Sequence, residues 1–333
     1  MVQPSERARA LVAGAYDTHV HVAPDVMPRL VDDVTLARNC AEVGLAGFVL
    51  KSHYVPTAER AAVVRTVVPG VDVLGAITLN ASVGGLNPVA VEIAGRQGAR
   101  VVWLPTVDSR NQRESRAQAP EGSVPPMWAR VQDELAGRGI TAPAVEVVDG
   151  EGAVVPALRQ ILALVKEHDM VLATGHLSGP EIAVVAEAAA EAGVRRIVVT
   201  HPEFTSQRLP VEAQRELAAR GALLERCFTT PHSGKVSWEV LADHIRRTGP
   251  EHSVLSSDLG QPFNPPVEDG LALLADRLLA YGFTDDEIHR MAVTNSRRLV
   301  EGAPRRGAPS RNESDDQRLP LSTDGGSGIA TGT

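Results

Sequence analysis

The stretch Asp17-Thr18-His19-Val20-His21 lies within the first apolar run of the sequence, Ala15–Val22. Residues i and i+2 of a β-strand point to the same face, so a strand here places both imidazoles on one side, about 7 Å apart along the chain. Such a pair can bind one metal ion, at a metal–nitrogen distance of about 2.0–2.1 Å for zinc. The alternative is an ordinary pair of hydrogen-bonding residues at a strand end, and the other histidines help to choose between the two.

Length and composition define the class of protein. The chain has 333 residues, of which 43% are hydrophobic and only 3% aromatic, so its core is aliphatic and large enough for one big domain or two smaller ones. The net charge of −8 argues against nucleic acid or an anionic membrane as a partner. These values say nothing specific about the substrate. A small molecule is the expected partner, and homo-oligomer formation stays open.

The cysteines and the apolar segments bear on location. Cys40 and Cys227 are too few for a disulfide framework. Residues 1–9 are not followed by an apolar run of signal-peptide length, and no stretch of 18 apolar residues occurs. The sequence therefore predicts a cytoplasmic protein without a membrane span.

Short β-branched runs alternate with amphipathic helical stretches along most of the chain. The eight runs are Ala15–Val22, Gly47–Lys51, Val71–Leu79, Val101–Thr106, Val171–His176, Ile197–His201, Ala222–Glu225 and Val254–Asp258. Apolar strands that each precede a helix are typical of a parallel sheet covered by helices. Eight such units predict an α/β fold of the (β/α)8 TIM type, and a doubly wound open sheet is the competing architecture.

The same pattern divides the chain into parts. An N-terminal extension, 1–14, precedes the barrel, 15–302, and a tail rich in Arg, Ser, Gly and Pro, 303–333, is expected to be disordered. The rhythm breaks at 108–149, which is too long for an ordinary loop and is predicted to fold over the active site. Met127 and Trp128 in this insertion are expected either to form an apolar wall of the pocket or to pack its helix on the barrel.

Histidines gather where the predicted strands end. In such barrels the active site lies at the carboxyl ends of the strands. His19 and His21 end the first run, His53 follows the second, His176 ends the fifth and His201 ends the sixth. Five of the ten histidines thus lie at one predicted mouth, which favours the metal interpretation.

Two charged residues end apolar runs at the same mouth. Asp258 ends the eighth run, and a buried carboxylate without a partner is costly, so Asp258 is predicted to bind metal or to act in catalysis; an N-cap is the alternative. Lys51 ends the second run. Its ammonium either pairs with Asp258 or a substrate anion, or burial lowers its pKa so that the amine takes up carbon dioxide and the carbamate bridges two metal ions.

The set His19-x-His21, Lys51, His176, His201 and Asp258 resembles the amidohydrolase superfamily of metal-dependent hydrolases, in order and in strand position, over about residues 15–300. Within it the chain resembles the DUF6282 family. The fragments that carry this likeness are Thr18–His21, Trp103–Thr106, Thr174–Ser178, Thr200–Pro202 and Ser257–Gln261. The resemblance implies a divalent metal, most often zinc, and hydrolysis of an amide, cyclic amide or lactone-type bond with Asp258 as the base.

One departure from the superfamily concerns the metal count. Members with two metals usually take a bridging Lys or Glu from the fourth strand, but here that run ends in Leu104-Pro105-Thr106. Lys51, on the second run, is the candidate bridge instead. One metal held by His19, His21, a further His and Asp258 and a pair of metals both stay open.

Further residues at the mouth are expected to contact substrate. They are His53, which alternatively binds metal, with Asn80, Thr106, Asp108, Arg226 and Gln261. Arg226 suggests an anionic group on the ligand, and a surface salt bridge is its alternative. The competing functions are a metal-dependent phosphoesterase or a decarboxylase-type lyase on the same barrel, and a binding protein without catalysis.

Overall fold

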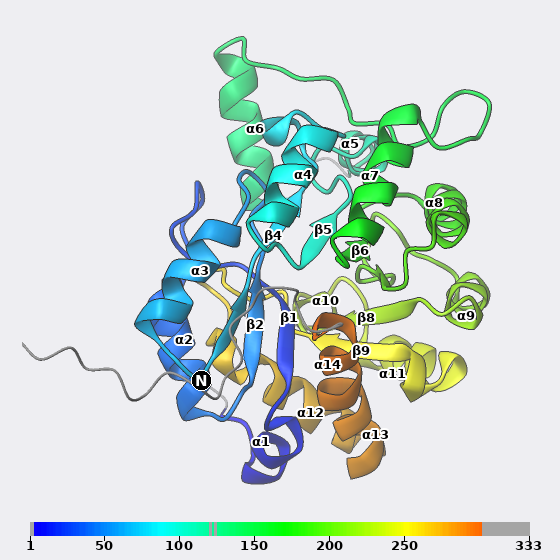
Figure 1. The fold of residues 1–333 in the computed structure, drawn as a ribbon. Coiled ribbons are helices and arrows are strands. Elements are labelled where there is room, and N and C mark those ends of the chain that lie inside the picture. The colour runs from blue at the N-terminus through cyan, green and yellow to red at the C-terminus, as the bar shows by residue number, and fades with distance from the viewer. Residues whose placement is uncertain (1–2, 120–121, 123–124, 302–333) are drawn as a thin grey trace, which may run out of the picture. The chain divides into compact units, whose positions relative to one another are not determined.

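Parallel strands surrounded by helices form the body of the protein (Figure 1). The computed structural model describes residues 3–119, 122 and 125–301. The strands are β1 (Tyr16–Val20), β2 (Gly47–Leu50), β3 (Asp72–Leu74), β4 (Ala76–Thr78), β5 (Val101–Trp103), β6 (Val171–Ala173), β7 (Ile197–Val199), β8 (Leu223–Cys227) and β9 (Ser253–Ser256). Every neighbouring pair with a hydrogen-bonded ladder is parallel, in the order β1-β2-β3 and β4-β5-β6-β7-β8-β9.

The helices follow the strands along the chain. They are α1 (Glu6–Val12), α2 (Asp33–Glu42), α3 (Ala58–Val67), α4 (Pro88–Arg96), α5 (Arg110–Ala117), α6 (Met127–Gly137), α7 (Pro156–Glu167), α8 (Gly179–Ala192), α9 (Val211–Ala219), α10 (Thr229–His232), α11 (Trp238–Thr248), α12 (Gly270–Ala280), α13 (Asp285–His289) and α14 (Asn295–Val300). None of the described helices is both long and apolar enough to cross a membrane.

Hydrogen bonds between β1 and the residues that directly follow β9 close the ring. The Asp258 amide donates to the His19 carbonyl at 2.9 Å, and the His21 amide donates to the Leu259 carbonyl at 2.8 Å. The predicted (β/α)8 barrel of the TIM type is therefore confirmed, and the open doubly wound sheet is not the architecture of this chain.

The third predicted strand is divided at Gly75 into β3 and β4. Thr57 occupies the gap: its hydroxyl donates to the Leu50 carbonyl at 2.7 Å, and its amide donates to the Ala76 carbonyl at 2.9 Å. A Cβ at position 75 would lie 2.3 Å from the Cα of Ala58, so only glycine permits this approach. Thr57 thus continues the ring where the strand ladder is interrupted.

Two layers of apolar side chains hold the barrel together. Alternate strand residues such as Val49, Trp103 and Leu223 form a cluster inside the ring, whereas Phe48, Val102 and Leu224 pack outward against helices. Because successive strand residues point to opposite faces, nearly every strand position is buried and the strands are continuously apolar.

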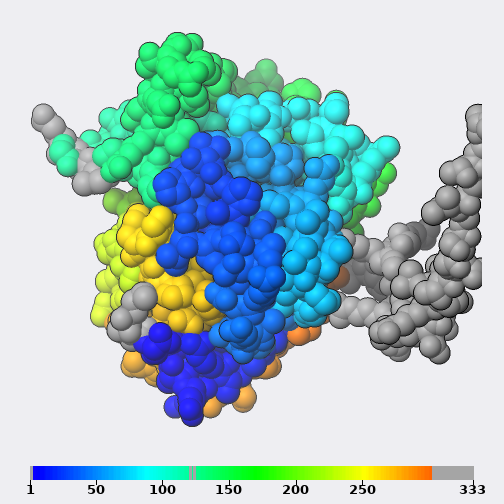
Figure 2. Space-filling model, turned by 90° about the vertical axis from the view of Figure 1, so that its left-hand side faces the viewer, coloured from blue at the N-terminus to red at the C-terminus, as the bar shows by residue number. Residues whose placement is uncertain are grey.

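The segments outside the repeating βα units also have defined places. Helix α1 in the predicted extension is attached to the barrel by Ser5, whose hydroxyl donates to Asp276 at 2.6 Å, and by the Arg9–Asp269 ion pair at 2.7 Å. The insertion contains the expected helix as α6 and a second one, α5. Its green atoms stand at one end of the face drawn in Figure 2. The predicted disordered tail, 303–333, lies outside the described residues.

Candidate metal centre

The mouth of the barrel brings His19, His21 and Asp258 together. Asp258 Oδ1 lies 3.2 Å from His19 Nε2 and 3.3 Å from His21 Nε2, and both imidazoles are buried. One ligand atom of each residue lies within 4.8 Å of those of the other two, a spacing that one metal ion can bridge. The closure of β9 onto β1 is what places the carboxylate beside the His-x-His pair.

The backbone around Asp258 is held in an uncommon conformation. Asp258 has φ +53°, a left-handed value that few non-glycine residues adopt. Two residues later, a Cβ on Gly260 would lie 1.5 Å from the His21 carbonyl oxygen, so glycine is required there. Thr229 donates to Asp258 Oδ2 at 2.9 Å and fixes the carboxylate. Such strain is often found at functional sites.

Lys51 lies against His19 of this group. Its Nζ is 2.9 Å from His19 Nε2 and 5.1 Å from the centre of the Trp103 ring. Burial lowers the pKa of Lys51, although Asp258 and Glu225 act in the opposite direction. A buried amine of lowered pKa at a cluster of ligands is compatible with either predicted role, ion pairing or carbamate formation.

The other predicted histidines complete a continuous group of rings. The ring centre of His201 lies 5.9 Å from that of His19 and 5.0 Å from that of His176, and the ring of His53 lies 4.9 Å from that of His21. His201 Nδ1 is buried without a hydrogen-bond partner. A bare ring nitrogen at this place fits a metal ligand, because buried polar atoms otherwise find partners.

The mouth keeps four of its histidines neutral. Burial lowers the pKa of His21, His53 and His176 well below the ordinary value and that of His201 to about 4. Neutral imidazole is the form that binds metal. For Asp258, burial raises the pKa, but the facing His19 and His21 outweigh it and hold the pKa well below its usual range. These four imidazoles are thus uncharged beside an ionised Asp258 carboxylate.

Asn80 and Thr106 brace the loops beside the centre. The Asn80 amide donates to the Thr106 hydroxyl at 2.8 Å and to the His53 carbonyl at 3.0 Å, and His53 Nδ1 lies 2.9 Å from the same hydroxyl. Asp108 adjoins this brace and accepts from the Ala81 amide at 3.0 Å. Gln261 donates to the Asp258 carbonyl at 3.2 Å and so lies next to the predicted base.

Arg226 does not lie at the mouth, and the prediction that it binds a substrate anion is wrong. Its side chain is fully buried on the outer face of β8. The guanidinium pairs with Glu203 and donates to Gln214 at 2.8 Å and to Thr248 at 2.9 Å. The reason is the alternation of the strand, which directs residues 225 and 227 inward and residue 226 outward.

Glu225 is the site residue that the sequence interpretation missed. Its carboxylate lies 3.2 Å from His19 Nδ1 and accepts from Ser256 Oγ at 2.8 Å. Burial raises the pKa of Glu225, but His19, His201 and Lys51 outweigh it and lower the value to about 2. An ionised carboxylate at Nδ1 keeps the proton on that nitrogen and leaves Nε2 without one, as a metal ligand requires in carboxylate–histidine–zinc arrangements.

Replacing Glu225 by Gln should weaken zinc binding by about 10- to 100-fold, because the amide no longer fixes the tautomer of His19. Competition with a chromophoric chelator measures the zinc affinity directly. Glu216→Gln, an exposed change on α9, makes the same substitution away from the mouth and should leave the affinity unchanged. Equal affinities for Glu225→Gln and the unchanged protein would remove Glu225 from this role.

The buried histidines also predict a pH dependence of stability in the metal-free protein. In the folded protein the pKa values of four histidines lie below the unfolded value of about 6.5; these are His21, His53, His176 and His201. Below pH 6.5 the unfolded chain therefore binds more protons than the folded protein, and the free energy of unfolding, which is undiminished above that pH, decreases as the pH falls. Burial raises the pKa of Asp17 to about 6, which partly compensates in this window. The free energy of unfolding should be about 2 kcal/mol lower at pH 6.0 than at pH 7.5.

Urea unfolding after treatment with a chelator tests this dependence. Ionic strength is held constant between the two pH values. A stability at pH 6.0 equal to or above that at pH 7.5 would show that the imidazoles are not neutral in the folded protein.

The comparisons with known proteins identify a family and a fold. A model of the DUF6282 family, described as a family of unknown function, matches residues 14–225. This is more than half of the chain, which therefore belongs to that family. None of the curated proteins compared with the chain matches it.

Solved structures with a similar fold cover nearly the whole described body. The chain is similar to the probable dipeptidase PvdM from Pseudomonas aeruginosa, with 11% identity, 88% of this chain and 96% of that chain covered, and a TM-score of 0.57. An amidohydrolase from Burkholderia multivorans with bound zinc is 13% identical, with 87% of this chain and 100% of that chain covered and a TM-score of 0.55. A putative 2-pyrone-4,6-dicarboxylic acid hydrolase from Pseudomonas putida is 16% identical, with 86% of this chain and 97% of that chain covered and a TM-score of 0.52. At these identities the likeness establishes the fold, which is the amidohydrolase-type barrel.

Proposed function

We propose that this protein is a metal-dependent hydrolase that cleaves an amide, cyclic amide or lactone-type bond of a small molecule in the cytoplasm. The observation that carries the proposal is the convergence of His19 Nε2, His21 Nε2 and Asp258 Oδ1 at the carboxyl ends of the strands. The partnerless ring nitrogen of His201 supports it. Zinc fits this donor set of nitrogens and one carboxylate.

The residues present divide the chemistry among them. His19, His21 and Asp258 would hold a first ion, with His176 and His201 as further ligands of it or of a second. When bound, such an ion lowers the pKa of a water molecule toward about 7 and polarises the bond to be cleaved. Asp258, which is ionised and fixed by Thr229, accepts the proton of the attacking water and returns it to the leaving group.

Lys51 bears on the number of ions. Its Nζ lies 2.9 Å from His19 Nε2, so a carbamate formed there would reach the ligands of the first ion. We propose two ions if Lys51 is carboxylated and one if it stays an amine. Native mass spectrometry, which detects the added carbon dioxide, and zinc counted per chain together choose between these forms.

The test of the proposed function begins with elemental analysis of the purified protein. Zinc-loaded protein is then offered lactones, cyclic amides, N-acyl amino acids and p-nitrophenyl acetate. We expect one or two zinc ions per chain and zinc-dependent hydrolysis that a chelator abolishes. A protein that binds no divalent ion at micromolar concentration would refute the proposal, and so would a zinc-loaded protein that cleaves none of these bonds but decarboxylates aromatic acids or cleaves phosphoesters.

A further inference from the structure

A cavity of about 680 Å³ lies beside the candidate metal centre, between the barrel and its insertion. Helix α6 contributes Val131 and Leu135, and the segment after it contributes Ile140. Tyr54, Ser82 and Val107, from loops of the mouth, face them. The volume falls in the range of about 300–1,000 Å³ that is typical of small-molecule sites. Met127 and Trp128, for which an apolar wall and the packing of the insertion helix were both open, are not among the lining residues.

Three loops connect this cavity with the metal centre. Each contributes one residue to the brace at the centre and the next residue to the cavity wall: the pairs are His53 and Tyr54, Asn80 and Ala81, and Thr106 and Val107. The ring centres of His53 and Tyr54 are 6.2 Å apart, and His53 in turn stacks on His21. The cavity therefore begins one residue beyond the cluster, on the same rim.

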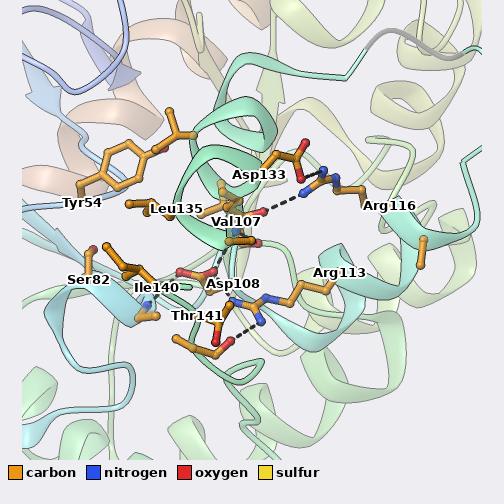
Figure 3. Close-up of a pocket in the computed structure, with 16 residues that line it drawn as sticks. Tyr54, Ser82, Val107, Asp108, Arg113, Arg116, Asp133, Leu135, Ile140 and Thr141 are labelled. Carbon is orange, nitrogen blue, oxygen red and sulfur yellow. Dashed lines mark hydrogen bonds and ion pairs between the residues drawn. The ribbon is translucent and has the colours of Figure 1, made fainter. Parts of the chain in front are cut away.

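The charges in the cavity wall are already paired. Asp108 binds Arg113 at 2.7 Å and Gln132 at 2.9 Å, and Arg116 pairs with Asp133. Figure 3 shows these ion pairs on one side of the close-up, whereas Tyr54, Leu135 and Ile140 lie together on the other. Such a wall gives no unpaired charge to an ionic group and much apolar surface to a neutral one.

The Tyr54 hydroxyl adds no polar group to this apolar surface. Its oxygen is buried and has no hydrogen-bond partner. Since a water-sized group cannot touch this oxygen, Tyr54 contributes its ring and not its hydroxyl to the cavity wall.

We infer that this cavity binds an uncharged, apolar tail of the substrate, alkyl or aryl, while the cleavable bond lies at the metal centre. The inference rests on the proposed function. On this inference, the insertion selects substrates by the part of the molecule that lies farthest from the cleavable bond. Contacts far from the reacting bond can contribute to rate by orienting that bond.

A series of hydroxamic acids tests the inference without knowledge of the substrate. The hydroxamate group binds zinc, and the attached chain probes the cavity. Isothermal titration calorimetry is carried out on the zinc-loaded full-length protein with acetohydroxamic, hexanohydroxamic and octanohydroxamic acids. Each methylene buried from water is expected to improve affinity about threefold to fourfold. The series should therefore gain about 100-fold or more if three or four methylenes enter the cavity.

Two variants on α6 provide the matched comparison. Leu135→Trp fills the cavity and should abolish the gain with chain length. Arg130→Trp adds the same side chain at an exposed position of that helix outside the lining and should keep the gain. Circular dichroism and zinc content show that both variants are folded and loaded.

The outcomes separate this inference from the proposed function. If acetohydroxamic acid binds but longer chains gain nothing, or if Leu135→Trp keeps the gain, the inference is overturned and the metal centre stands. If octanohydroxamic acid binds equally well after zinc removal, the cavity is an independent site and the inference is overturned. If none of the acids binds the zinc-loaded protein, the proposed function fails, and the inference fails with it.

Discussion

Replacing Asp258 by Asn should lower kcat/KM for p-nitrophenyl acetate about 10²- to 10⁴-fold in the zinc-loaded protein. The amide keeps an oxygen at the same place as a weak ligand but cannot accept the proton of the attacking water. His19 and His21, together with His176 and His201, remain to hold zinc. Initial rates at saturating zinc and elemental analysis of the same sample separate lost chemistry from lost metal.

A matched change of charge serves as the control. Asp243 is exposed on α11, and Asp243→Asn should leave both the rate and the zinc content unchanged. An Asp258→Asn variant with full activity would exclude Asp258 as the base. A variant that contains no zinc even in excess metal would show that the carboxylate is an indispensable ligand.

Arg226→Ala should lower the free energy of unfolding by about 3–5 kcal/mol, because it leaves Glu203 buried without its guanidinium partner. His244 remains 3.1 Å from Glu203 and can compensate only in part. Since the side chain faces away from the mouth, KM for any substrate of the folded variant should not change. Guanidinium chloride unfolding and steady-state kinetics on one preparation measure both quantities.

The double variant Arg226→Met, Glu203→Gln provides the control for this pair. It removes both charges and keeps most of the buried volume, so it should regain a large part of the stability lost in Arg226→Ala. If Arg226→Ala is as stable as the unchanged protein, or raises KM more than about tenfold, the buried pair is not what holds this part of the barrel.

The architecture could be predicted from the sequence because the pattern of an apolar run followed by a helix is repeated. Eight apolar runs each precede a helix, and every strand overlaps one of those runs. The division at Gly75 could not be seen, since it depends on Thr57, a residue of the preceding segment that fills the gap. The convergence of His19, His21 and Asp258 followed from their strand-end positions, which a parallel barrel gathers at one mouth.

The errors and omissions at the site share one physical cause. The seventh run is predicted to end at Glu225, and Arg226 is therefore expected at the mouth, near the strand end. Strand β8 continues to Cys227, so the alternation turns Glu225 inward and Arg226 outward. The pattern Leu223-Leu224-Glu225-Arg226-Cys227 contains this alternation. The burial of the ion pair against the helices depends on tertiary packing, which the local sequence pattern does not reveal. The cavity likewise depends on the packing of α6.

The contact of β9 with β1 has a consequence for biosynthesis. The Ser257 amide donates to Asp17, which lies 240 positions earlier in the chain. A growing polypeptide therefore carries its first imidazole pair long before the carboxylate that completes the cluster has been made. High-affinity zinc uptake should begin only when the last βα unit has left the ribosome, so chains stopped before Ser253 would contain most of the ligands and still bind the ion weakly.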